Sequence, residues 1–207
     1  MELLKKERSI LLVVDLQGKL MDMVYAPTLI TASTIHLLKF ADLFQVPVIL
    51  TEQYPQGLGP THPKISEVFQ GLSTKKYLIN KTSFGCWGDT QFVNTLQQLH
   101  TGVFHNEVQI IVAGIEAHIC VMQTVLELIT ANYQVYACWD CISSRGEENR
   151  QYALARMQQA GAAIISHESV AFEWARDKNH PQFKKVNQLL KDDPIPQLTS
   201  TTRSQVW

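Results

Sequence analysis

The sequence predicts a three-layer α/β/α fold, with a doubly wound sheet of about six parallel strands covered by helices on both faces. Its short strand-like runs are apolar throughout, as in parallel strands buried on both faces. They alternate with longer segments whose apolar residues recur at helical spacing. Polar residues follow most of these runs, as expected where strand ends form a binding edge. For such a sheet we expect the strand order 3-2-1-4-5-6.

The predicted strands share aliphatic and β-branched residues and the short length typical of strands. They cover residues 9–15, 46–51, 76–81, 108–114, 135–139 and 162–166. The second run carries Pro47, which is compatible with the first residues of a strand, and the third run is the weakest. Helical periodicity covers residues 29–44, 89–99, 121–132 and 147–160. Residues 53–63, with three prolines and two glycines, are predicted to be a loop.

Length and composition predict one domain and narrow the possible partners. A chain of 207 residues with 45% hydrophobic residues can form one large core, which we assign to residues 1–190, with 191–207 as a C-terminal arm or tail. A net charge of -1 argues against nucleic acid or an anionic membrane as partner. No apolar run approaches the ~18 residues of a membrane span. Four irregularly spaced cysteines favour a reducing location, the cytoplasm or an organelle matrix.

Three chemically useful side chains follow three different predicted strands. Asp15 ends the first, Lys81 ends the third, and Cys120 lies between the fourth strand and the next helix. A thiol at a helix N-terminus faces unpaired N–H groups and the positive end of the helix dipole, which favour the nucleophilic thiolate. Each residue also has an ordinary interpretation: a buried thiol, a capping aspartate or a solvated lysine. Their convergence at one edge favours a catalytic group.

The residues around these three side chains resemble the motifs of a known enzyme family. The sequences at 12–17 (LVVDLQ), 81–84 (KTSF) and 114–120 (GIEAHIC) resemble signatures of the isochorismatase-like cysteine hydrolases. Residues 50–59 (LTEQYPQGLG) resemble one branch more closely, the isochorismatase domain-containing proteins, whose physiological substrate is generally unassigned. The resemblance extends from about Ile10 to about His180. No single tripeptide is specific, but three motifs in order at three strand ends are strong together.

The resemblance implies a mechanism for a small-molecule substrate. Cys120 would attack an amide-type carbonyl, Asp15 would accept the thiol proton, and Lys81 would hold both charges in place. The N–H groups of Glu116 and Cys120 would bind the oxyanion, with a cis peptide bond between Ile115 and Glu116. A thioester intermediate would then be hydrolysed by water.

Departures from the family pattern constrain the substrate. Metal-dependent nicotinamidases carry an Asp-x-His pair and a later histidine after the second strand, where this chain has Glu52, Tyr54 and His62. That set is a poor metal site, so we expect neither a metal nor another cofactor, and nicotinamide is disfavoured. Isochorismatases proper lack the thiol, so Cys120 favours a small amide, carbamoyl or imide-like compound over isochorismate.

Four further residues are candidates for substrate binding. The amide of Gln17 could orient Asp15 or the substrate, and the aromatic rings of Tyr54, Phe84 and Trp87 could form walls of the pocket. Each ring is equally compatible with ordinary packing. The family resemblance also implies a homo-oligomer of unspecified number.

Two rival interpretations use other features of the chain. The first is a catalytically idle scaffold for oligomer or partner binding, which retention of all three catalytic residue types argues against. The second is redox chemistry at Cys138-Trp-Asp-Cys141, where Cys138 falls within a predicted strand and the next predicted helix begins only near Glu147, so no helix N-terminus activates the pair. Two cysteines without a second pair also make a poor zinc site. We therefore interpret Cys138 and Cys141 as buried packing residues and Asp140 as a structural cap.

Overall fold

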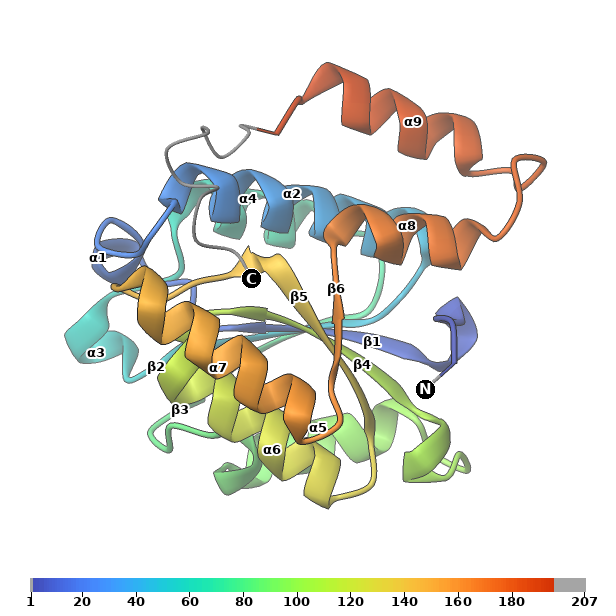
Figure 1. Cartoon of the computed structure of the whole chain (residues 1–207). Helices are drawn as coiled ribbons and strands as arrows, with labels where there is room; N and C mark the ends of the chain where they lie inside the picture. The colour runs from blue at the N-terminus through green and yellow to red at the C-terminus, as the bar shows by residue number, and fades with distance from the viewer. Residues whose placement is uncertain (1, 196–207) are drawn as a thin grey trace.

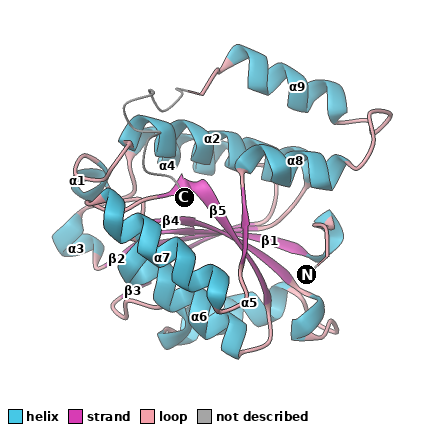
Figure 2. Ribbon diagram, in the orientation of Figure 1, coloured by secondary structure: helices cyan, strands magenta, loops and turns pink. Residues whose placement is uncertain are grey.

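The computed structural model describes residues 2–195, and it contains one parallel sheet with the order β3-β2-β1-β4-β5-β6 (Figures 1 and 2). The predicted fold class and strand order are confirmed. The strands are β1 (Ser9–Val14), β2 (Val48–Gln53), β3 (Lys76–Lys81), β4 (Gln109–Gly114), β5 (Gln134–Ile142) and β6 (Ala163–Ile165).

The helices cover both faces of the sheet. They are α1 (Gly18–Met21), α2 (Pro27–Phe44), α3 (Pro55–Leu58), α4 (Pro63–Gly71), α5 (Thr90–Leu99), α6 (Met122–Thr130), α7 (Glu147–Gln159), α8 (His167–Ala175) and α9 (Phe183–Asp192). In Figure 1, α2, α4 and α8 lie on one face and α5, α6 and α7 on the other, with α9 packed outside α2 and α8. Two apolar cores result, because alternate residues of β1 point to opposite faces: Leu11 and Val13 to one core, Leu12 and Val14 to the other.

Several helices lie where no helix was predicted. The expected loop at 53–63 contains α3, since Pro55 occupies the first turn of a helix, where its fixed φ angle is tolerated. α1, α4, α8 and α9 were also missed. α9 crosses the expected boundary at residue 190, and residues 196–207 of the expected arm lie outside the described residues.

Two irregularities at the carboxyl ends of the central strands shape that edge. Gly114 ends β4 with φ at +138°, and a Cβ there would lie 2.1 Å from the Val14 carbonyl oxygen, so only glycine fits beside β1. In β5 the pairing with β4 is interrupted between Ala137 and Ile142. Within residues 2–195, no helix combines the length and apolar character that crossing a membrane requires.

Candidate active site

Asp15, Lys81 and Cys120 meet at the carboxyl edge of the sheet, each delivered by a different strand. Asp15 directly follows β1 in the left-handed region, with φ at 51°, and Lys81 is the last residue of β3. Cys120 lies in the turn after β4. All three are buried, with exposed fractions of 1%, 2% and 7%. The structure therefore brings together the three side chains that the sequence predicted to be neighbours.

A buried ion pair joins two of them. Lys81 Nζ lies 2.6 Å from Asp15 Oδ2, and the two side chains are 0% and 2% exposed. The other oxygen, Asp15 Oδ1, accepts a hydrogen bond from Thr51 Oγ1 at 2.7 Å. The ammonium group also donates to three further acceptors: Gln53 Oε1 at 2.8 Å, Phe84 O at 3.0 Å and Ser83 O at 3.1 Å. Both charged groups are therefore held in fixed positions.

Cys120 lies in a π-helical turn, Ala117–Val121, which runs directly into α6. Burial raises the pKa of its thiol to about 12, and the negative charge of Asp15 and a hydrogen bond between the two side chains act in the same direction. The positive charge of Lys81 opposes them and is outweighed. The sequence predicted a thiolate favoured by a helix N-terminus, and this prediction is wrong for the resting state. The thiol is protonated at neutral pH and lies beside the Asp15 carboxylate.

The backbone before Cys120 offers two N–H groups near the thiol. The peptide bond between Ile115 and Glu116 is cis, as the resemblance implied. Outside the π-helical turn itself, the N–H groups of Glu116 and Cys120 have no hydrogen-bond acceptor among residues 2–195. The Glu116 carboxylate is turned to Arg145, accepting from its N–H at 3.0 Å and its Nε at 3.1 Å. This carboxylate is thus committed to Arg145.

Gln17 has a different place from the one expected. Its Nε2 donates to the carbonyl oxygens of Gln53 and Gly59 at 3.0 and 2.6 Å, and its Oε1 accepts from the Gln53 N–H at 2.7 Å. The side chain is fully buried. Its polar atoms therefore fasten the loop after β2 and leave no amide group to orient Asp15 or a substrate.

The loop after β2 is also held by Glu52, one of the residues compared above with metal ligands. Glu52 Oε1 accepts from both the N–H and the hydroxyl of Thr61, each at 2.7 Å. A carboxylate used in this way fixes the shape of the loop.

The three aromatic candidates separate into two groups. The side chains of Tyr54 and Phe84 are 55% and 56% exposed, on loops that follow β2 and β3 at the active edge. The Trp87 ring instead packs edge-on against Tyr133, with 5.9 Å between ring centroids. Tyr133 directly precedes β5, at the amino edge of the sheet. Trp87 therefore takes part in core packing, the ordinary alternative to a wall of the pocket.

Sequence reasoning did not identify four polar residues around the three side chains. Thr51 and Gln53, on β2, bond Asp15 and Lys81, and the Thr124 hydroxyl donates to the Cys120 carbonyl at 2.7 Å while accepting from the Cys86 N–H at 3.0 Å. Cys86 is a second thiol at this edge and is fully buried, near enough for Lys81 and Asp15 to influence its pKa, which burial raises to about 12. The alternation of Thr51 and Gln53 along a strand that ends at the active edge was the available signal.

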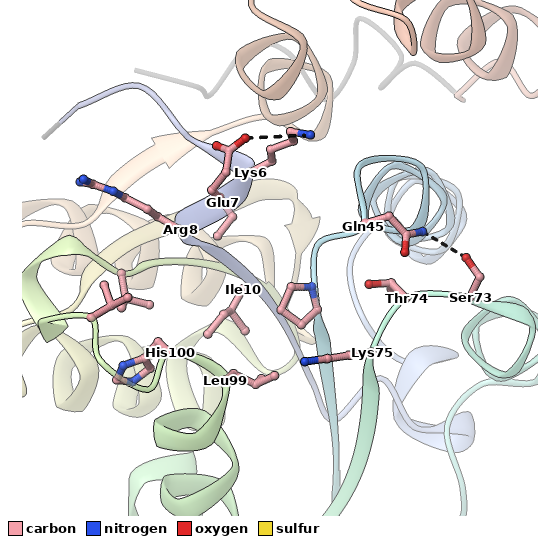
Figure 3. A pocket seen from close by; sticks show the side chains of 14 residues that line it. Lys6, Glu7, Arg8, Ile10, Gln45, Ser73, Thr74, Lys75, Leu99 and His100 are labelled. Carbon is pink, nitrogen blue, oxygen red and sulfur yellow. Dashed lines mark hydrogen bonds and ion pairs between the residues drawn. The ribbon is translucent and has the colours of Figure 1, made fainter.

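A hollow of about 400 Å³ lies at the opposite edge of the sheet (Figure 3). Its lining includes Ile10, Lys75 and Val108, which stand at the amino ends of strands. Because the hollow lies at the amino ends of the strands, it is remote from Asp15, Lys81 and Cys120 at the carboxyl ends. Ligands of doubly wound folds bind at the carboxyl ends, so this hollow is not the expected substrate site.

Comparison with known proteins identifies the family and related folds. The family model of the isochorismatase domain matches residues 9–169. The rat protein named isochorismatase domain-containing protein 2 is 38% identical over 194 residues, which cover 93% of this chain and 85% of the relative. A structure described as the MAR1 ribonuclease of Caenorhabditis elegans superimposes with a TM-score of 0.82 at 30% identity, covering 96% of this chain and 100% of that one. The YcaC gene product of Escherichia coli, described as an octameric hydrolase of unknown specificity, gives a TM-score of 0.81 at 26% identity, covering 92% and 90%.

Proposed function

This chain belongs to the isochorismatase family, a family of hydrolases, and from that premise we propose that it hydrolyses a small amide, carbamoyl or imide-like compound through a thioester on Cys120. The observation that carries the proposal is the buried contact of a thiol, a carboxylate and an ammonium group at the carboxyl edge of the sheet. A nucleophile, its base and a charge that orients the base are what nucleophilic catalysis requires.

In the first step, Asp15 accepts the proton of the Cys120 thiol as the sulfur attacks the substrate carbonyl. Because the thiol pKa is raised, a free thiolate does not accumulate, and proton transfer accompanies attack. The carbonyl oxygen becomes an oxyanion, which the N–H groups of Glu116 and Cys120 would bind; outside the π-helical turn, neither has an acceptor among residues 2–195.

In the second step, Asp15 returns the proton to the leaving nitrogen, and the C–N bond breaks to leave a thioester. A water molecule then attacks the thioester, with Asp15 accepting one of its protons. The acid product departs as the proton returns to the sulfur. Lys81 keeps its charge throughout and stabilises the ionised form of Asp15 across the 2.6 Å contact. The cycle uses only the substrate and water, so no cofactor or metal enters the proposal.

Tyr54 and Phe84 are the described aromatic residues placed to shape substrate access, since their exposed rings stand on loops at this edge. We also propose a homo-oligomer, supported by the octameric E. coli relative, and a reducing compartment such as the cytoplasm, supported by four free thiols.

The proposal is tested by intact-mass spectrometry of the wild type, Cys120→Ala and Cys86→Ala after incubation with small amides, carbamoyl compounds and aldehydes. Aldehydes trap a thiol nucleophile reversibly. We expect adducts on the wild type and on Cys86→Ala, and none on Cys120→Ala. The Cys86 variant is a matched control, because it removes another buried thiol near the same ion pair. Absence of any adduct, with no turnover of the panel, would favour the idle scaffold.

A further inference from the structure

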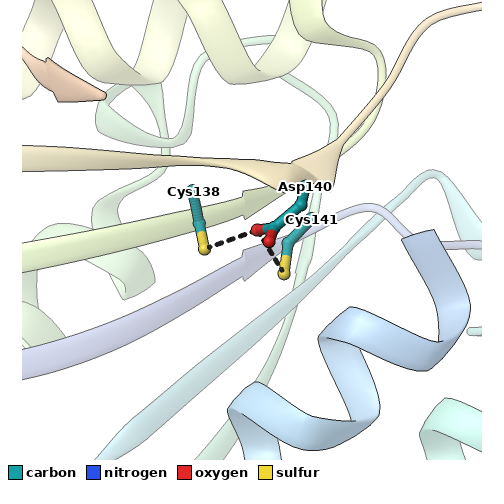
Figure 4. A group of neighbouring side chains, drawn as sticks. All are labelled: Cys138, Asp140 and Cys141. Atoms are coloured by element: carbon teal, nitrogen blue, oxygen red, sulfur yellow. Dashed lines mark hydrogen bonds between the residues drawn. The ribbon is translucent and has the colours of Figure 1, made fainter. Parts of the chain in front are cut away.

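Cys138 and Cys141 lie in the irregular segment of β5. Two residue steps on β4, from Val112 to Gly114, face five steps on β5, from Ala137 to Ile142. In a regular strand, residues three positions apart point to opposite faces. The extra residues remove that alternation, and both cysteine side chains turn toward the carboxylate of Asp140 (Figure 4). This convergence is absent from the C-x-x-C pattern as read from the sequence.

The three side chains place their ligand atoms within 4.8 Å of one another. Cys138 Sγ and Cys141 Sγ lie 3.4 and 3.8 Å from the same oxygen, Asp140 Oδ1. Both thiols are free and fully buried, and Asp140 is 5% exposed. Buried sulfur and carboxylate groups that converge on one point differ from exposed acidic clusters, whose charges are simply solvated.

These separations match the coordination sphere of zinc. With Zn–S near 2.3 Å and Zn–O near 2.1 Å at a tetrahedral angle, sulfur and oxygen ligands stand about 3.6 Å apart. The two observed S–O separations lie on either side of that value. We propose that Cys138, Cys141 and Asp140 form a structural zinc site that is separate from the active site.

The carboxylate is already oriented for this role. Asp140 Oδ2 is 2.7 Å from His167 Nδ1, and Oδ1 accepts from the His167 backbone N–H at 3.0 Å. A metal bound at Oδ1 would leave the contact between Oδ2 and the imidazole in place. Such an outer contact fixes the position of a ligating group. The structural cap predicted at Asp140 and the proposed metal ligand are thus compatible.

The segment is also held from its outer side. The buried guanidinium of Arg150 donates from Nε to the Ile142 carbonyl at 2.7 Å and from Nη2 to the Trp139 carbonyl, and it stacks on the Trp139 ring at 5.5 Å. These contacts flank the two cysteines. The ligands are therefore presented by a fixed backbone, as a structural site requires.

One further polar side chain lies beside the cluster. The fully buried Thr34 hydroxyl of α2 lies next to the Cys141 thiol without the geometry of a hydrogen bond, and has no other partner among the described residues. It supplies a polar group beside the three ligands.

Binding of Zn²⁺ would release one proton from each thiol and form two Zn–S bonds and one Zn–O bond, with no change of oxidation state.

The experiment compares metal content after refolding in Zn²⁺ and gel filtration. We expect about one zinc per chain in the wild type and in Cys86→Ser, and a loss of at least tenfold in occupancy in Cys138→Ser and Cys141→Ser. Cys86→Ser is the control, because it replaces an equally buried free thiol outside the cluster. A wild type without zinc, or a Cys138→Ser/Cys141→Ser double variant that keeps it, would overturn the proposal.

A second measurement needs no variant and so does not depend on whether a serine variant folds. X-ray absorption of the zinc-refolded wild type should show two sulfur neighbours and at least one oxygen or nitrogen. A shell of oxygen and nitrogen alone would place the metal elsewhere and refute the site. Neither readout depends on turnover, so the zinc proposal and the hydrolase proposal stand or fall separately.

Discussion

Replacing Lys81 with methionine should destabilise the protein far more than removing a lysine from an exposed ion pair of the same length. Lys81 Nζ and Asp15 Oδ2 are 2.6 Å apart, and their side chains are 0% and 2% exposed. At an effective dielectric constant near 20, this separation corresponds to an attraction of about 6 kcal/mol. Loss of the ammonium leaves the buried carboxylate uncompensated, which costs about 3–5 kcal/mol of the free energy of unfolding.

An internal control is available on the surface. Lys39 Nζ and Asp193 Oδ2 are 2.7 Å apart, but their side chains are 32% and 56% exposed. Solvent and salt screen such a pair, and its coupling energy should be below about 1 kcal/mol. The two pairs share residue types and distance and differ in burial, so the comparison isolates the effect of burial.

The assay is a double-mutant cycle for each pair, with free energies of unfolding from urea titrations at neutral pH. The buried cycle uses Lys81→Met, Asp15→Asn and the double variant, and the exposed cycle uses Lys39→Met, Asp193→Asn and their double. We expect a coupling of about 3 kcal/mol in the buried cycle, since the double variant leaves no unpaired charge. A buried coupling no larger than the exposed one would refute the reasoning, because it would mean that water reaches the Asp15–Lys81 pair.

Two further predictions test the same edge of the sheet. Because burial and Asp15 raise the pKa of Cys120 to about 12, its labelling rate with iodoacetamide should still be rising at about pH 10, and a plateau near neutrality would contradict this. Gly114→Ala should lower the free energy of unfolding by at least about 3 kcal/mol, because its Cβ would meet the Val14 carbonyl oxygen. Gly102→Ala should lower it by only about 1 kcal/mol, because residue 102 has φ at +82° but lies in open space. Equal losses in urea unfolding of the two variants would show that the close approach is absent.

The sheet could be predicted because most of its strands are apolar throughout, while two of the missed helices, α4 and α9, bury little. Val186 is the one buried residue in α9, and α4 buries only Ile65 and Phe69. So few buried positions give no clear helical periodicity, and these helices depend on contacts with α2 and α8 that no local pattern encodes. A helix that buries only one or two residues, as α4 and α9 do, leaves little periodic signal in the sequence.

The site was predictable to the extent that it depends on strand ends. Asp15 and Lys81 stand at the ends of strands that parallel pairing brings to one edge. The hydrogen-bond and packing partners of individual side chains were not predictable, because they depend on the conformations of the loops. The Gln17 amide bonds two backbone segments, and the Trp87 ring packs on Tyr133. The same limit applies to β5, where the irregular pairing alone turns two cysteines toward one carboxylate.

The error in the predicted state of Cys120 has a physical cause that also shapes the mechanism. The sequence placed the thiol before a helix and implied a lowered pKa from the helix dipole. In the structure, the thiol lies inside a π-helical turn, where burial penalises the thiolate and the nearest charge is the carboxylate of Asp15. Lys81 neutralises that carboxylate and only partly offsets its effect on the sulfur. A protonated, buried thiol resists oxidation and alkylation at rest. In the proposed mechanism it would become nucleophilic only when a substrate carbonyl is there to receive the sulfur as the proton leaves for Asp15.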